Sequence, residues 1–267
     1  MAKHANVNAI AAGSGGSVLV ERCQVSGSED LRSILFLGFL PPVNTMAPIG
    51  TRPNEQPAYP AELLYCPESK LVQLGLIVDP AVLFPPHYAY TSGTTRILRD
   101  NFAELYTEVM NLYPISHDAL AVDIGSNDGT LLSGFKKKCK ILGIEPTNTA
   151  KIANSNGINT VQDFMNENLA KRIVRKYGKA HLITATNVFA HMADLGKIVR
   201  SIEILLNNNG HFVLENHYLL DVIKDRQFDS IYHEHIRTYC LKPIIKLFSF
   251  YNLKVIRVER ASRYGGN

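Results

Sequence analysis

After His117, short apolar runs alternate with helical patterns, and this alternation constrains the fold more than any other feature of the sequence. The runs predicted to be strands are residues 120–124, 141–144, 158–161, 181–186, 211–215 and 254–258. Helical spacing recurs between them, most clearly at Met192, Leu195, Val199, Ile202 and Leu206. The alternation predicts right-handed crossovers and an α/β fold, with a mainly parallel sheet covered by helices on both faces. Ligands of such sheets bind at the carboxyl ends of the strands.

The chain before this region divides into three parts. Residues 1–20 are rich in Ala, Gly, Ser and Asn, and we expect a flexible tail. Residues 21–90 hold 10 of the 13 prolines, which break regular elements and predict a loop-rich module of short strands. Residues 91–117 carry one connecting helix, which Pro114 ends. Residues 118–267 then form the α/β domain.

The composition of the chain limits the partners that we expect and indicates its cellular compartment. Lys and Arg total 28 against 24 Asp and Glu, an excess too small to indicate a nucleic-acid partner. No apolar run approaches the ~18 residues that a membrane span needs. Four cysteines are too few for a disulfide framework, which indicates a reducing, cytoplasmic compartment. The sequence leaves the oligomeric state open.

A glycine loop follows the first predicted strand of the α/β domain, in residues 123–130. Its glycines are spaced Gly-x-x-x-Gly, which does not match the dinucleotide fingerprint, and no Lys-Ser/Thr pair follows as a phosphate loop requires. An acidic loop without lysine suits a cationic sulfonium ligand better than a triphosphate. Taken alone, the loop could equally be a tight turn without a ligand.

Carboxylates at the next strand ends favour the ligand-binding interpretation. Glu145 lies 20 residues after Gly125, where a carboxylate can accept both hydroxyls of a ribose. Asp163 follows the third strand and is placed to meet an adenine amino group. This arrangement predicts a class I methyltransferase dependent on S-adenosylmethionine (SAM). The predicted cofactor-binding residues are Asp123, Gly125, Asn127, Asp128, Gly129, Glu145, Asp163 and Asn187.

Residues 228–235 read Phe-Asp-Ser-Ile-Tyr-His-Glu-His. A neutral imidazole with a pKa near ~6.5 can take a proton, and a neighbouring carboxylate can orient it. His-x-His also binds metals, although no third ligand stands at a clear spacing. General base chemistry, a metal site and ordinary surface residues are therefore three open interpretations. His191, after the fourth strand, is either a reactive group or the first residue of a helix.

These motifs, with residues 187–191, 215–218 and 260–266, resemble the nucleotide-sugar C-methyltransferases of deoxysugar biosynthesis. The resemblance covers residues ~21 to 267, and its most specific piece is Tyr-His-Glu-His. It implies a Rossmann-like class I domain after a small N-terminal module of zinc-binding type. It also implies methyl transfer from SAM to a carbon beside the ketone of a dTDP-linked keto-deoxysugar. By resemblance His235 is the proton-abstracting base, and the sugar site is lined by Glu234, Tyr232, His191 and a tyrosine at position 88 or 90, for which we take Tyr90.

One departure from the family concerns metal. The family's module is built from two Cys-x-x-Cys pairs, whereas this chain has Cys23-Gln-Val-Ser26 and Cys66-Pro-Glu-Ser69. Each pair lacks its second thiolate, and a serine hydroxyl is a poor zinc ligand at neutral pH. We therefore predict no metal site, with Cys23 and Cys66 as the remaining candidate ligands.

The second departure concerns length, since the family continues well beyond the glycines at 265 and 266. We expect a truncated member that lacks the seventh strand, is poorly soluble or partly disordered from about Leu241 onward, and has little activity. Two other functions are also considered. One is an NAD(P)-linked nucleotide-sugar oxidoreductase, against which the glycine spacing argues. The other is a catalytically inactive remnant that still binds SAM.

Overall fold

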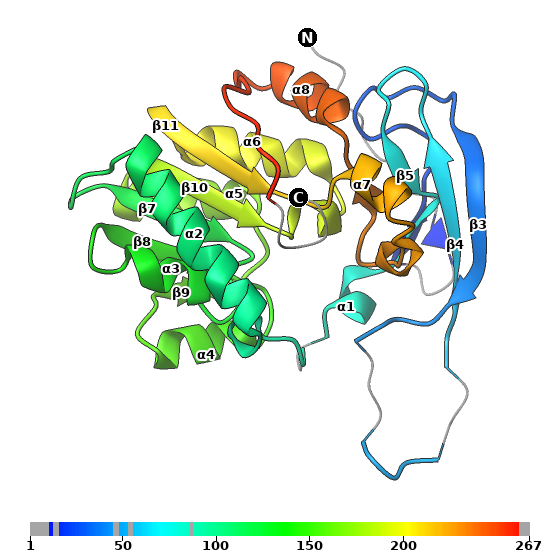
Figure 1. The fold of residues 1–267 in the computed structure, drawn as a ribbon, viewed down its shortest axis with the longest axis horizontal. Helices are drawn as coiled ribbons and strands as arrows, with labels where there is room; N and C mark the ends of the chain where they lie inside the picture. The colour runs from blue at the N-terminus through cyan, green and yellow to red at the C-terminus, as the bar shows by residue number, and fades with distance from the viewer. Residues whose placement is uncertain (1–10, 13–15, 45–47, 53–55, 86–87, 262–267) are drawn as a thin grey trace. The chain divides into compact units, whose positions relative to one another are not determined.

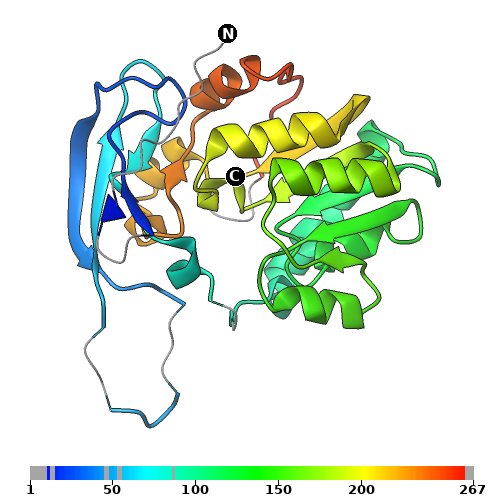
Figure 2. The same cartoon turned by 180° about the vertical axis from the view of Figure 1, so that it is seen from behind.

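The computed structural model of the chain describes residues 11–12, 16–44, 48–52, 56–85 and 88–261. The chain folds into two compact units, each assembled from segments that are distant in sequence (Figures 1 and 2). Unit 1 comprises residues 1–85, 190–196 and 217–258, and unit 2 comprises residues 86–189, 197–216 and 259–267. The loop-rich first part of the chain therefore shares unit 1 with two later segments.

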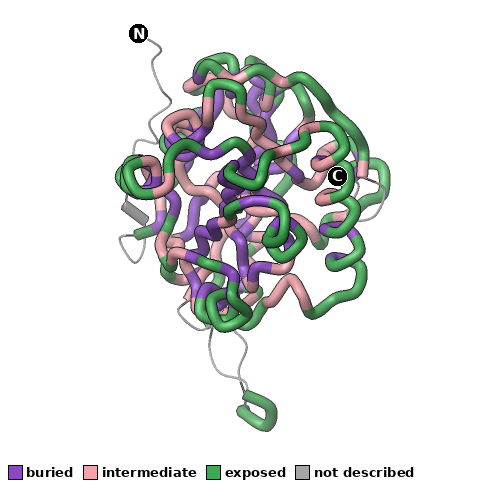
Figure 3. Tube along the Cα trace, turned by 90° about the vertical axis from the view of Figure 1, so that its left-hand side faces the viewer, coloured by how far each residue is buried: buried purple, intermediate pink, exposed green. Residues whose placement is uncertain are grey.

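Unit 2 contains a five-stranded sheet in the order β11-β10-β7-β8-β9, in which every pairing is parallel. Its strands are β7 (Leu120–Ile124), β8 (Lys140–Ile144), β9 (Thr160–Val161), β10 (Ala180–Thr186) and β11 (Leu206–Glu215). All five residues of β7 are buried, and buried stretches are purple in Figure 3. The first five predicted strands and the α/β class are thus confirmed.

Helices cover both faces of this sheet, with α2, α3 and α4 on one side and α5 and α6 on the other (Figures 1 and 2). The helices are α2 (Arg96–Leu112), α3 (Thr130–Phe135), α4 (Thr149–Ser155), α5 (Glu167–Tyr177) and α6 (Leu195–Leu205), with short 3-10 turns at Ser92–Thr94 and Phe189–His191. Leu98 and Phe102 of α2 pack against Leu131 and Phe135 of α3. The apolar spacing that predicted α2 therefore forms its buried face.

Unit 1 contains two antiparallel sheets of short strands. One has the order β12-β5-β4-β3, from β3 (Arg32–Leu40), β4 (Tyr59–Tyr65), β5 (Val72–Leu74) and β12 (Arg237–Thr238). The other has the order β1-β2-β6, from β1 (Ala11–Ala12), β2 (Ser17–Leu19) and β6 (Leu76–Ile77). The helical segments are α1 (Pro80–Leu83), α7 (Leu219–Lys224), a 3-10 turn at Phe228–Ser230, and α8 (Leu241–Ser249).

A buried arginine joins the late segments of unit 1. Arg237 of β12 is only 2% exposed, and its guanidinium donates to the carbonyls of Met192 and Ala193, the latter at 2.9 Å. A buried cation requires such acceptors, because it has lost its hydration. The helix predicted from Met192 begins instead at Leu195, after the two carbonyls that bind Arg237.

The predicted strand at 254–258 is wrong. No described residue after α8 belongs to a strand or helix, and the side chains of Ile256 and Val258 are 64% and 57% exposed. Apolar alternation makes a strand only where a neighbouring strand pairs with its backbone groups, and no described strand pairs with these residues. Disorder from Leu241 is also contradicted, because α8 forms and buries Leu247 and Phe248.

Two other expectations concern the glycine turn near the end of the chain and membrane-spanning segments. The glycine turn at positions 265 and 266 lies outside the described residues. Within the described ranges, no helix is both long and apolar enough to traverse a bilayer.

The C-terminal segment generates a prediction about amide exchange. Amides of 254–258 should exchange with solvent much faster than those of β7, because they lie outside any ladder whereas β7 pairs on both sides. Hydrogen-exchange mass spectrometry on the whole chain measures both segments at once. Equal protection of the two would show that 254–258 is paired after all.

Candidate active site

The loop after β7 has a backbone that few residues can adopt. Gly125, Asn127 and Gly129 have φ angles of 73°, 50° and 81°, in the left-handed region. A Cβ at Gly125 would lie 2.4 Å from Val188 Cγ1, so a side chain there is excluded by sterics as well. The loop thus keeps its backbone open at the carboxyl end of β7, where ligands of parallel sheets bind.

The side chains of Asn127 and Asp128 fasten a neighbouring segment to this loop. Asn127 Oδ1 accepts the amide proton of Ser92 at 2.8 Å, and its Nδ2 donates to the carbonyl of Tyr90 at 3.2 Å. Asp128 Oδ2 accepts from the amide of Gly93 at 2.8 Å. The structure therefore gives both predicted cofactor residues a positioning role, and it places Tyr90 beside the loop in unit 2.

Glu145, at the end of β8, connects the loop to the next strand. Its Oε2 accepts from the Asn127 amide at 3.1 Å, and its Oε1 accepts from the amide and hydroxyl of Thr147 at 2.9 and 2.7 Å. The side chain is buried. A carboxylate oxygen has two lone pairs, so Oε2 retains acceptor capacity for a ligand hydroxyl.

Asp123 lies within β7 rather than in the loop. Burial raises its pKa to about 7, the hydrogen bond from Thr184 Oγ1 (2.7 Å) opposes that rise, and the charge of Glu145 adds to it. The pKa of Asp123 thus lies far closer to neutral pH than that of an exposed aspartate. A cation bound nearby would favour its charged form.

The end of β10 brings together residues that the sequence analysis had not combined. Asn187 Nδ2 donates to Glu215 Oε1 at 3.2 Å, and Asn101 Nδ2 of α2 donates to both carboxylate oxygens of Glu215, at 3.0 and 3.2 Å. Glu215 ends β11 much as Glu145 ends β8, so its position was a signal that the sequence analysis did not use. Asn101 sits in a helix and gave no such signal.

Two buried polar atoms at this edge of the sheet test whether a cofactor fits. Ser126 Oγ and Asn187 Oδ1 have no hydrogen-bond partner among the described residues. Buried polar atoms usually have partners, and a bound ligand can supply them. Together with the open glycine backbone and the acceptor capacity of Glu145, they fit a ligand such as SAM. Asp163 forms an ion pair with Arg172, at 3.5 Å, and its contact with the adenine stays a prediction.

Unit 1 contains a cluster of three histidine rings. The ring centroids of His191 and His217 each lie 5.0 Å from that of His235, and the Tyr232 ring lies 4.2 Å from it. Phe84 stacks on His191 at 5.8 Å. Three of the predicted catalytic residues are thus brought together, and His217 joins them although the sequence analysis had not chosen it.

The contacts of His235 determine its tautomer. Its Nδ1 lies 2.7 Å from the carbonyl oxygen of Ser230, which can only accept, so Nδ1 carries the proton. Nε2 is then the acceptor, and the Tyr232 hydroxyl donates to it at 3.1 Å. Burial lowers the pKa of His235 to about 4, the Ser230 carbonyl opposes this shift, and His217 adds to it. At neutral pH the imidazole is uncharged and can accept a proton at Nε2.

The remaining members of the Tyr-His-Glu-His motif have other partners. Glu234 is buried and accepts a hydrogen bond from Asn44 Nδ2. His233 Nε2 donates to the carbonyl of Pro60 at 3.1 Å. The carbonyl of Ser230 therefore orients His235, a task that the sequence analysis had assigned to the neighbouring carboxylate.

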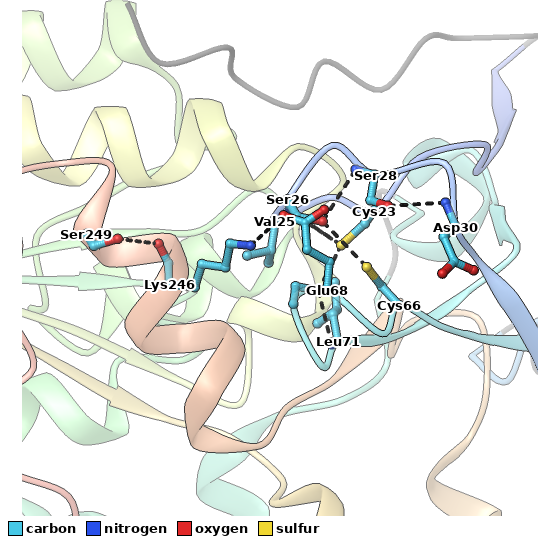
Figure 4. Close-up of polar contacts among 11 residues, drawn as sticks. Cys23, Val25, Ser26, Ser28, Asp30, Cys66, Glu68, Leu71, Lys246 and Ser249 are labelled. Atoms are coloured by element: carbon cyan, nitrogen blue, oxygen red, sulfur yellow. Dashed lines mark hydrogen bonds and ion pairs between the residues drawn. The ribbon is translucent and has the colours of Figure 1, made fainter.

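The two Cys-x-x-Ser turns of unit 1 also meet (Figure 4). Cys23 Sγ lies 3.0 Å from Ser69 Oγ, and Cys66 Sγ lies 3.5 Å from Ser26 Oγ. Burial raises the pKa of the Cys66 thiol, but hydrogen bonds with Ser26 and Ser69 outweigh burial and lower it overall. Two thiols and two hydroxyls do not fit a closed tetrahedral zinc site, and no group of three or more His, Cys, Asp or Glu in the described residues could hold a metal.

Comparison with known proteins places this architecture in a family. A family model described as "Methyltransferase domain" matches residues 97–258, and one described as "Putative zinc binding domain" matches residues 23–84. The chain belongs to the methyltransferase-domain family. This membership, with the parallel sheet and the loop after β7, makes unit 2 a class I SAM-dependent methyltransferase fold and leaves the NAD(P)-linked oxidoreductase without support.

Two relatives illustrate the match. The chain is 26% identical over 250 residues to C-methyltransferase NovU of Streptomyces niveus, an alignment that covers 93% of this chain and 59% of NovU. The chain thus spans less than two thirds of the length of that relative. A SAM dependent methyltransferase from Archaeoglobus fulgidus shares the fold, with a TM-score of 0.50 and 12% identity over 60% of this chain and 72% of that one.

The cofactor site predicts the effect of neutralising Glu145. Glu145→Gln should weaken SAM binding by about 1–3 kcal/mol, since one oxygen that can accept from a ribose hydroxyl becomes a donor. Calorimetric titration measures the affinity. Glu167→Gln, which changes a half-buried carboxylate paired with Lys171 on α5, is the matched control. Unchanged affinity in Glu145→Gln would remove Glu145 from the cofactor site.

The histidine cluster predicts an unusual titration. A free histidine is half protonated near ~6.5, whereas His235 should be half protonated near pH 4 and remain neutral at pH 5.5. NMR of histidine-labelled protein follows the ring directly. In His217→Gln the pKa of His235 should rise, because a neighbour that disfavours its charge is gone. A His235 ring that titrates near 6.5 would contradict the buried neutral state.

Proposed function

We propose that the protein is a SAM-dependent C-methyltransferase that methylates the carbon beside the ketone of a nucleotide-linked keto-deoxysugar. The observation that carries the proposal is the hydrogen-bond chain from the Ser230 carbonyl through His235 to the Tyr232 hydroxyl. It presents a neutral imidazole acceptor, which can remove the proton that a carbon acid must lose before the carbon attacks a methyl group. The family membership and the match to a C-methyltransferase support the same chemistry.

The residues around the loop after β7 would hold the cofactor. Glu145 would accept the ribose hydroxyls, and Ser126 and Asn187 would offer their buried oxygens to its polar groups. When bound, SAM supplies an electrophilic methyl group on a sulfonium. Asn127 and Asp128 would keep residues 90–93 in place beside it.

The residues of the histidine cluster would generate the carbon nucleophile. His235 would remove the acidic proton beside the ketone at Nε2, either directly or through the Tyr232 hydroxyl. The enolate oxygen formed in this step needs hydrogen-bond donors. Tyr232 and His191, whose Nε2 is buried and has no partner among the described residues, are the candidates for this task.

The proposal that the substrate is a sugar nucleotide rests on the Tyr-His-Glu-His motif and the family resemblance that it carries, because methyl transfer to carbon alone does not specify the acceptor. In this proposal the methyl acceptor is a small molecule, and neither a nucleic acid nor a membrane is a partner. We place the reaction in the cytoplasm, on the sparse cysteines of the chain. Along the sequence, His191 and His217 follow Asn187 and Glu215 by four and two residues.

Solvent exchange at the substrate carbon tests the base without requiring the complete reaction. The chain, incubated with a dTDP-4-keto-6-deoxy sugar in deuterium oxide, should incorporate deuterium beside the ketone. His235→Ala should lose this exchange by about 10²–10⁴-fold, the usual contribution of a general base, and should still bind SAM. Mass spectrometry of the recovered sugar measures the incorporation.

Controls separate the alternatives. His117→Ala changes an exposed histidine of unit 2 and should leave exchange intact. Exchange that persists at the original rate in His235→Ala would move the base to His191 or a tyrosine. An unaltered chain that binds SAM but exchanges no proton would instead be the catalytically inactive remnant.

A further inference from the structure

Two turns of unit 1, 23–28 and 66–71, share one backbone pattern. In each, the amide four residues after the cysteine donates to the cysteine carbonyl, from Gly27 to Cys23 and from Lys70 to Cys66, both at 2.8 Å. The donors have φ angles of 75° and 64°. A lysine in the left-handed region is unusual, so the second turn keeps this conformation even without glycine.

The correspondence extends further along each turn. The Cys23 amide donates to the Ser28 carbonyl at 2.8 Å, and the Cys66 amide donates to the Leu71 carbonyl at 2.9 Å. The amides of Ser28 and Leu71 in turn donate to Ser26 Oγ and Ser69 Oγ, at 3.3 and 3.2 Å. Both serines therefore occupy the same place in equivalent turns, three residues after the cysteine.

The side chains connect the turns crosswise (Figure 4). Each serine Oγ already accepts an amide proton, so its own hydroxyl proton is free to reach the cysteine of the other turn. Ser69 meets Cys23 at 3.0 Å, and Ser26 meets Cys66 at 3.5 Å. The Cys23 sulfur also accepts from the amides of Val25 and Ser26, at 3.5 and 3.4 Å. The four side chains form one hydrogen-bonded cluster.

We propose that this cluster replaces a metal centre: Cys23, Ser26, Cys66 and Ser69 stand at four ligand positions, and hydrogen bonds join the turns that zinc would otherwise join. A tetrahedral Cys₄ site takes two ligands from each of two turns, and within each turn the second ligand lies three residues after the first. Both sulfurs are fully buried, and Ser69 is almost so. Unit 1 thus folds without metal, although residues 23–84 match the family model described as "Putative zinc binding domain".

Later segments of unit 1 contact the two turns and enlarge the unit to which the turns belong. Lys246 Nζ of α8 bonds to Glu68 Oε1 of the second turn at 2.7 Å, and Cys240 Sγ approaches the Lys70 carbonyl at 3.8 Å. A small isolated module needs zinc because it buries too little surface to fold. These turns instead belong to a larger unit that includes residues 217–258.

Restoring the two missing thiolates tests the proposal. The purified, unaltered protein should retain well under one zinc per molecule, and a chelator should not change its melting temperature. The double variant Ser26→Cys/Ser69→Cys should bind about one zinc and should melt at a lower temperature after chelation. Elemental analysis and thermal unfolding by circular dichroism give the two readouts.

A matched control adds two thiols elsewhere. Ser133→Cys/Ser155→Cys changes exposed serines on α3 and α4 and should gain neither tightly bound zinc nor chelator sensitivity. One zinc retained by the unaltered chain after chelation would overturn the proposal, as would a folded Ser26→Cys/Ser69→Cys chain that binds none. If that variant fails to fold, Ser69→Ala provides the test. This variant should lower the melting temperature to the same extent with and without chelator. A loss that depends on the chelator would refute the metal-free cluster.

Discussion

Buried polar groups must find partners inside the protein, and this requirement organises both units. Arg237 shows it most clearly, because a guanidinium without water needs several acceptors. The carbonyls of Met192 and Ala193, which precede the start of α6 at Leu195, accept from the two terminal nitrogens of the guanidinium, whereas its Nε has no hydrogen-bond partner among the described residues. One buried cation thereby holds the segment after His191 against β12, which lies more than 40 residues later in the chain.

The same requirement sets the chemistry of the histidine cluster. Burial disfavours the charged imidazole, so His191, His217 and His235 all have lowered pKa values. The Ser230 carbonyl then selects the tautomer of His235 that exposes Nε2 as an acceptor. A group buried in this way is a base at neutral pH without an acidic neighbour to orient it.

Both units contain buried polar atoms without hydrogen-bond partners among the described residues, and two of those in unit 2 lie at the edge of the sheet where ligands bind. Glu145 is shared between the Asn127 amide and Thr147, and Glu215 is shared between Asn101 and Asn187. Ser126 Oγ and Asn187 Oδ1 stay without partners among the described residues. The two carboxylates are thus held in place by hydrogen bonds at the carboxyl ends of the strands. The unpartnered oxygens mark the place where a polar ligand would supply the missing hydrogen bonds.

The sequence by itself determined the parallel sheet of unit 2, its strand ends and its glycine loop, because apolar periodicity and left-handed glycines are local properties of a chain. Through the family resemblance it also identified Cys23 and Cys66 as the remaining thiols of two Cys-x-x-Cys pairs. Only the tertiary structure decided that 254–258 is not a strand, that Ser230 orients His235, and that the serines cross-bond the two turns. Each of these depends on a partner far away in sequence, and periodicity carries no information about which distant group will satisfy a buried donor or complete a ladder.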